Sequence, residues 1–166
     1  MDQILEILAL SEPEFLRQCR IDHFQASGPG GQKRNRKLSA VRLIHIQSSI
    51  SVTSSEYRET SRNLAIAINK LKLELAIKLD LDPQIQEADL TARIKFNKDV
   101  SEQNPQFPLM ILLAVTLFKR YRGSIRELSL SLNTSSPQLI KFLKKSKQVW
   151  TSIQEIRRQN GHPPLK

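Results

Sequence analysis

Residues 27–37 decide how this sequence is interpreted, and they read Ser27-Gly28-Pro29-Gly30-Gly31-Gln32-Lys33-Arg34-Asn35-Arg36-Lys37. Three glycines and a proline within four residues exclude regular structure and predict a loop with unusual backbone angles. Because Gly30 and Gly31 carry no Cβ, their N–H groups can approach a substrate closely. Four of the five residues after Gln32 are cationic, which suits RNA phosphates. The stretch predicts a small, uncharged tip backed by positive charge.

Short elements are predicted on both sides of this loop. The run from Ser11 to Glu14 is typical of a capping box that opens a helix ending near residue 18 or 19, and residues 21–25 alternate as in a short strand. Residues 41–46 and 50–53 predict a hairpin around 47–49. An apolar face over about 56–79, formed by Leu64, Ile68, Leu71 and Leu75, predicts a long helix. We therefore expect an α+β fold with a small antiparallel sheet packed on a long helix.

The second half of the chain has a different character. Residues 80–107 are polar and acidic, which predicts a linker with a short helix near 86–96, between a domain over 1–79 and a module over 108–166. Helices are predicted over 108–121, 124–132, 136–146 and 148–159. Apolar and small residues at the spacing of a helix-turn-helix are Leu128, Ser129, Asn133, Leu139 and Phe142. The module is therefore expected to be all-helical and helix-turn-helix-like.

The charge distribution gives the first indication of a partner. The net charge is +10, with +7 over residues 33–72 and +9 over residues 106–166, and the two other segments carry −3 each. Two basic blocks predict two surfaces that face nucleic acid, although solvated faces without a ligand would give the same charge. On the predicted helix over 136–146, the candidate RNA-binding side chains are Lys141, Lys144 and Lys145.

Several classes of protein and site are excluded or disfavoured. One cysteine, Cys19, excludes an internal disulfide, and we expect it to be a buried, inert thiol on a helix face. The three histidines lack ligand spacing, so neither a metal site nor a cofactor is expected. The apolar run over 109–118 is too short to span a bilayer, so no membrane partner is expected. A lone thiol fits a cytoplasmic location.

The loop and the residues after it resemble class I peptide chain release factors. Ser27 to Gln32 looks like the Gly-Gly-Gln loop of that family. The positions downstream that keep the family's pattern are Asn35, Ser39-Ala40-Val41-Arg42-Leu43, His45, Arg58, Asn63, Ala67 and Leu71. The resemblance covers about residues 12–75. The pair Glu59-Thr60 and the turn over 47–49 depart from the family's usual residues.

The resemblance implies hydrolysis of the ester between nascent peptide and tRNA in the peptidyl transferase centre of the large ribosomal subunit. The Gln32 backbone N–H would stabilise the transition state or the leaving oxygen, while its side chain places the water and Gly30 and Gly31 shape the loop. Gln32 also resembles the glutamine that a methyltransferase modifies in this family. The expected contacts with ribosomal RNA or tRNA are Ser27, Lys33, Arg34, Asn35, Arg36, Lys37 and Arg42.

The length bears on the kind of release factor. Stop-codon readers carry a large additional domain, and this sequence has about 11 residues before the capping box. We therefore expect a monomeric, codon-independent peptidyl-tRNA hydrolase that rescues stalled ribosomes. Two alternatives remain open. One is a non-catalytic RNA- or ribosome-binding protein that retains the fold, and the other is a DNA-binding regulator that uses the helix-turn-helix alone.

Overall fold

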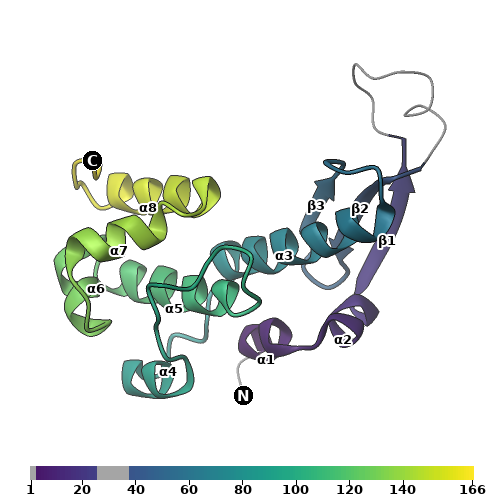
Figure 1. Cartoon of the computed structure of the whole chain (residues 1–166). Helices are drawn as coiled ribbons and strands as arrows, with labels where there is room; N and C mark the ends of the chain where they lie inside the picture. Colours follow the sequence, from purple (N-terminus) through teal and green to yellow (C-terminus); the bar gives the residue numbers. More distant parts are fainter. Residues whose placement is uncertain (1–2, 26–37) are drawn as a thin grey trace. The chain divides into compact units, whose positions relative to one another are not determined.

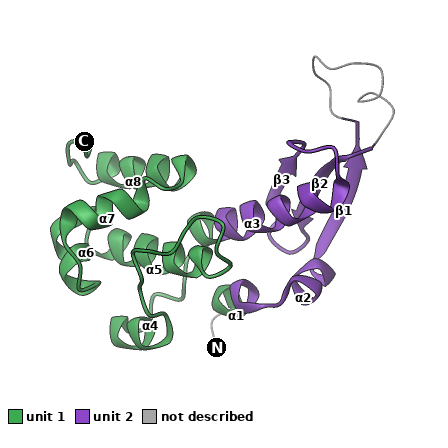
Figure 2. Cartoon of the chain, in the orientation of Figure 1, with its two compact units in different colours: residues 1–6, 76–166 green, residues 7–75 purple. Residues whose placement is uncertain are grey.

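The computed structural model describes residues 3–25 and 38–166, which form two compact units (Figure 2). Unit 2 comprises Ile7–Leu75, and unit 1 comprises Met1–Glu6 with Ala76–Lys166. Two helices, α1 (Gln3–Ala9) and α3 (Thr60–Lys78), each run from one unit into the other. A small antiparallel sheet with helices around it confirms the predicted α+β class.

Unit 2 contains a three-stranded antiparallel sheet in the order β1-β2-β3 (Figure 1). The strands are β1 (Cys19–Phe24), β2 (Ala40–His45) and β3 (Ser51–Ser54). Residues 41, 43 and 45 are buried and residue 42 is exposed, which is the alternation expected of a sheet with one covered face. The predicted hairpin is confirmed, and Ser49 at its turn has a φ of 57°.

The helices of unit 2 supply the other side of its core. In α2 (Glu12–Arg17), the predicted capping box is present: the Ser11 N–H donates to the Glu14 carboxylate at 3.1 Å. Phe15 is fully buried and its ring stacks on the His45 ring, with centroids 6.4 Å apart. Of the predicted apolar face of α3, Ile68, Leu71 and Leu75 are buried. The burial of these three residues confirms the apolar face predicted for this helix.

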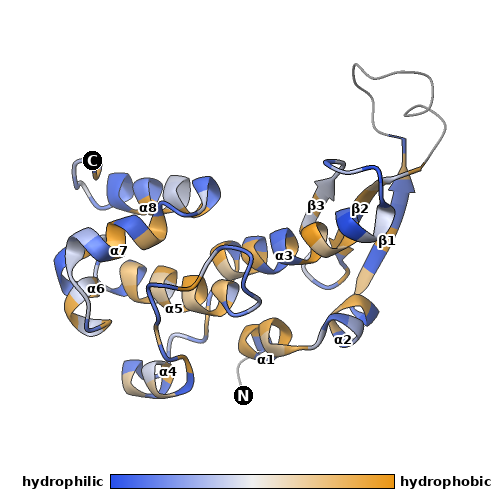
Figure 3. Cartoon of the chain, in the orientation of Figure 1, coloured by the Kyte–Doolittle hydropathy of each residue, from blue (hydrophilic) through white to orange (hydrophobic). Residues whose placement is uncertain are grey.

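Unit 1 is built around α5 (Phe107–Arg120), which is apolar on nearly every side (Figure 3). Such a helix has to be surrounded, and it contacts α4 (Glu87–Arg93), α6 (Ile125–Ser131) and α8 (Lys147–Gln159). The short helix predicted near 86–96 is present as α4. Its Leu90 is fully buried, and the predicted polar segment over 80–107 contributes apolar side chains to this unit's core.

The last three helices follow the predicted order. In α7 (Ser136–Leu143), Leu139, Phe142 and Leu143 are buried, and the Phe142 ring packs edge-on against Phe96 at 4.9 Å between centroids. Among the described residues, no helix is both long and apolar enough to cross a membrane.

Candidate nucleic-acid interface

One end of the sheet in unit 2 is where β1 ends and β2 begins. Phe24, the last residue of β1, pairs with Ala40, the first residue of β2. The residues between them join the two strands at this end. The predicted site residues Ser27, Gly30, Gly31, Gln32, Lys33, Arg34, Asn35, Arg36 and Lys37 lie outside the described residues.

Asn63 connects three segments at this end of the sheet. Its side chain is fully buried. Its Nδ2 donates to the Ser39 carbonyl at 2.7 Å and to the Tyr57 carbonyl at 2.8 Å, while Oδ1 accepts from the Tyr57 N–H at 3.0 Å. The Ser54 hydroxyl donates to the same oxygen at 3.4 Å. One amide therefore fixes the residue before β2, the end of β3 and the approach to α3.

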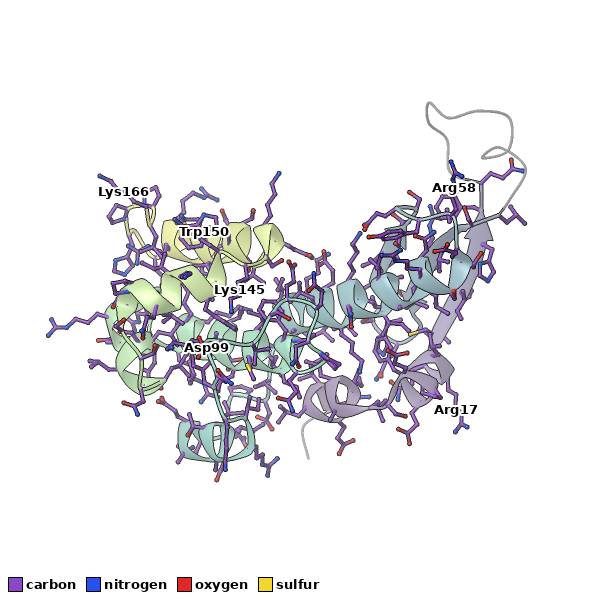
Figure 4. The ribbon with its side chains drawn as sticks, in the orientation of Figure 1. Arg17, Arg58, Asp99, Lys145, Trp150 and Lys166 are labelled. Atoms are coloured by element: carbon purple, nitrogen blue, oxygen red, sulfur yellow. The ribbon has the colours of Figure 1, made fainter. Side chains whose placement is uncertain are left out.

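Two cation–aromatic pairs lie in unit 2. Arg42 is exposed on β2, and its guanidinium carbon lies 5.8 Å from the Phe24 ring centroid. The guanidinium carbon of Arg62 lies 3.6 Å from the Tyr57 ring centroid. Arg58 is exposed at the same end of the unit (Figure 4). Arg42 was expected from the sequence, whereas the Tyr57–Arg62 pair was missed because no spacing rule couples a residue before a helix to one inside it.

His45 lies at the far end of β2 from this site. Its Nδ1 accepts from the Ser48 N–H at 3.3 Å and lies 2.8 Å from the Ser48 hydroxyl. These contacts hold the turn over 46–48 and assign the proton to Nε2, which is buried without a partner among the described residues. Burial lowers the pKa of the His45 imidazole below its ordinary value. The buried ring and these contacts give His45 a structural role at the turn.

Cys19 is half-buried, and the expected helix position is wrong: it is the first residue of β1, because α2 ends two residues earlier. Burial raises the pKa of the Cys19 thiol to about 11, against the weaker opposing charge of Lys72. The Lys72 ammonium donates to the Leu10 carbonyl at 2.7 Å and to the Leu8 carbonyl at 3.3 Å. It therefore ties the α1–α2 connection to α3, and burial lowers its pKa.

The helix-turn-helix pattern of unit 1 folds as α6 and α7. Asn133 in the turn has a φ of 48°, and Ser129 is buried with its hydroxyl 3.0 Å from that of Ser136. A small residue thus allows the two helices to approach, and an asparagine makes the left-handed turn. Both features were predicted from the sequence.

The predicted RNA-binding lysines of α7 have different surroundings. Lys141 is exposed, and Lys144, at the end of the helix, is exposed with its ammonium 4.9 Å from the Trp150 ring centroid. The Lys145 ammonium donates to the carbonyls of Lys98 and Val100, both at 2.7 Å, on the Asp99 segment (Figure 4). Contact of these lysines with RNA stays a prediction, and the geometry gives Lys145 a structural partner already.

Arg157 is a buried cation of unit 1 that binds two backbone carbonyls. Arg157 donates from Nη1 to the Gly123 carbonyl at 2.6 Å and from Nε to the Pro163 carbonyl at 2.9 Å. Gly123 adopts a φ of 80°, and a Cβ there would meet the Arg157 backbone at 3.2 Å.

Among residues 3–25 and 38–166, no three His, Cys, Asp or Glu side chains gather in a way that could hold a metal ion.

Comparison with known proteins identifies the fold family. The RF-1 domain model matches residues 16–106. Peptide chain release factor RF2 of Thermus thermophilus is 38% identical over 87 residues, covering 52% of this chain and 21% of that protein. Peptide chain release factor 1 of Lawsonia intracellularis is 32% identical over 126 residues, covering 70% and 35%.

A third relative is similar over a comparable share of its length. Peptide chain release factor 2 of Pseudothermotoga lettingae is 37% identical over 107 residues, covering 64% of this chain and 28% of that protein. The chain spans about a fifth to a third of the length of these three relatives. The matched residues 16–106 include the whole sheet, the buried Asn63 and the stretch over 27–37, and this protein belongs to the RF-1 domain family.

Proposed function

We propose that this protein hydrolyses the ester bond of peptidyl-tRNA on the ribosome and does so without reading a codon. The observation that carries the proposal is the match of residues 16–106 to the RF-1 domain, which contains Gly30-Gly31-Gln32 between two paired strands. The similar proteins are named peptide chain release factors. The proposed partners are ribosomal RNA of the large subunit and peptidyl-tRNA.

The proposed chemistry needs little from side chains. The backbone N–H of Gln32 donates to the oxygen on which charge develops, and loss of one such donor typically slows a reaction by about 10²–10³. Gly30 and Gly31 let this backbone approach the ester, and the Gln32 side chain places the water. The cations from Lys33 to Lys37, with Arg42 on β2, bind phosphates and hold the loop in position.

Codon independence is supported by the helices that follow the family match. Residues 107–166 contain α5 to α8, and two lysines, Lys141 on α7 and Lys144 directly after it, are exposed. A basic helical surface of this kind binds RNA through its phosphates, without reading bases. The helical part of unit 1 can thus supply ribosome affinity that does not depend on the codon.

The test is release of labelled peptide from ribosomes whose decoding site is empty, filled by a sense codon or filled by a stop codon. Equal release in all three states is the expected result, and dependence on a stop codon would overturn codon independence. Gln32→Pro and Gly31→Val should abolish release, with circular dichroism unchanged. Gln103→Ala, at an exposed glutamine of unit 1, serves as the control and should release at the unaltered rate.

A non-catalytic role is the second candidate, favoured by the exposed cations of α7. In that case the unaltered chain binds large subunits but releases no peptide in any of the three states. Release that persists in both Gln32→Pro and Gly31→Val would contradict the catalytic assignment while leaving ribosome binding in place.

A further inference from the structure

Tyr57 and Arg62 form a close cation–aromatic pair on the surface of unit 2, with the guanidinium over the ring. The Arg62 guanidinium carbon lies 3.6 Å from the centroid of the Tyr57 ring, which is the separation of two groups in van der Waals contact. Both residues are exposed, and Tyr57 keeps 37% of its surface accessible. The ion pairs found among the described residues do not include Arg62. The ring is therefore the surface on which this guanidinium is ordered.

The backbone of Tyr57 is fixed by the buried side chain of Asn63. Asn63 binds both the N–H and the carbonyl of Tyr57, at 3.0 Å and 2.8 Å, and is itself fully buried. Arg62 precedes Asn63 in α3, so both members of the pair rest on the same anchored amide. A surface fixed in this way loses little conformational entropy when a ligand binds to it.

The charge around the pair selects an anionic ligand. Arg58 adjoins Tyr57 and is exposed (Figure 4). Two exposed acids lie nearby, and one of them, Glu56, is paired with Lys70, while the other is Glu59. A planar surface among cations can receive a flat ring that is attached to a phosphate.

We infer that Tyr57 and Arg62 are a stacking platform for one unpaired base of RNA, with Arg58 on an adjoining phosphate. Unpaired bases stack on tyrosine rings and on guanidinium planes, and this contact tolerates any base. The inference deepens the proposed function and rests on it for the source of the base, an unpaired nucleotide of ribosomal RNA. A protein partner at the same position is an outcome that the test separates.

The test measures binding of the full chain to large ribosomal subunits, together with chemical probing of the rRNA. Tyr57→Ala should weaken binding by about 5-fold to 150-fold, the range for loss of one stacked base. Tyr57→Phe keeps the ring and should bind as the unaltered chain does. Arg62→Lys keeps the charge but loses the plane, so it should also weaken binding. Arg17→Lys, at the other end of unit 2, is the matched control (Figure 4).

Probing identifies the contact. The unaltered chain should protect at least one unpaired nucleotide that becomes reactive with Tyr57→Ala, while the rest of the footprint persists. Weaker binding without any change in rRNA reactivity would overturn the inference in favour of a protein contact. If the unaltered chain releases peptide and Tyr57→Ala and Arg62→Lys bind equally well, the platform is wrong and the proposed function stands.

A ten-nucleotide single-stranded RNA separates the remaining case. If the unaltered chain neither binds subunits nor releases peptide, the proposed function fails, and anisotropy with this oligonucleotide decides the platform by itself. Weaker oligonucleotide binding by Tyr57→Ala than by Tyr57→Phe would support it, and equal binding by both would overturn it.

Discussion

Asn63 donates its side-chain amide to the carbonyl of Ser39, a residue 24 positions earlier in the chain, at 2.7 Å. This contact ties the start of α3 to the residue that leads into β2. The same side chain binds both backbone groups of Tyr57. The amide therefore determines how the end of the sheet nearest the predicted loop is assembled.

Replacement of Asn63 should be costly. Asn63→Ala leaves two carbonyls and one N–H without their side-chain partner, and these bonds are partly buried, so each group costs less than the roughly 1–3 kcal/mol of a fully buried one. We expect the free energy of unfolding to fall by about 2–4 kcal/mol in urea titration. Asn97→Ala, which removes an exposed asparagine that caps the Asp99 N–H, is the control. A loss below about 1 kcal/mol in Asn63→Ala would show that water replaces the amide.

The His45 imidazole predicts a dependence of stability on pH. Burial lowers its pKa in the folded state below the ordinary 6.5, so the unfolded chain binds the proton more readily. The contribution is fully present above about pH 6.5 and is lost as the pH falls below that value. Protonation of Nδ1 would also place a second donor against the Ser48 N–H.

The measurement is urea unfolding between roughly pH 5 and pH 8. His45→Gln should flatten the decline in this range, whereas His23→Gln, at an exposed position on β1, should leave it unchanged. Glu14, whose pKa is lowered by its hydrogen bonds to Ser11, affects stability only at pH values near and below 4.5. An identical pH profile for His45→Gln and the unaltered chain would contradict the assignment.

Cys19 should react slowly with alkylating reagents. Its thiol has a pKa of about 11, so only a small fraction is thiolate near neutral pH. The alkylation rate of the folded chain should rise about tenfold for each pH unit from neutral pH up to near that value. Denaturation in urea should restore the rate of an ordinary thiol. A fast reaction of the folded chain at neutral pH would show that the thiol is not desolvated.

Asn133 offers a test of the turn between α6 and α7. Its φ of 48° is costly for most side chains, and Asn133→Val should destabilise the chain by about 1–2 kcal/mol. Asn133→Gly has no Cβ and should be tolerated. Thermal unfolding followed by circular dichroism measures both. Equal stability of the two variants would mean that the turn adopts another conformation.

Local patterns predicted the elements of this fold well. The capping box at Ser11 marked the start of α2, and the apolar face with Ile68, Leu71 and Leu75 marked α3. The spacing of Ser129 and Asn133 marked the α6–α7 turn. These features depend on residues close in sequence, where periodicity and caps determine the structure.

Long-range contacts could not be predicted in the same way. Asn63 was expected as part of a family pattern, but nothing local indicates its bond to Ser39. The Lys145 ammonium was expected to bind RNA, and no local signal indicates its bonds to carbonyls 47 and 45 residues away. The catalytic prediction at Gln32 depends on the motif and the family, because Gln32 lies outside the described residues.

Lys72 and Arg157 change what the chain's excess of cations means for an anionic polymer. Both side chains are buried, with 6% and 7% of their surface accessible, and both donate to backbone carbonyls. A buried cation displaces no counterion from a polyelectrolyte, because it cannot reach a phosphate. The dependence of affinity on salt concentration will therefore report fewer neutralised phosphates than the arginines and lysines in the sequence would suggest.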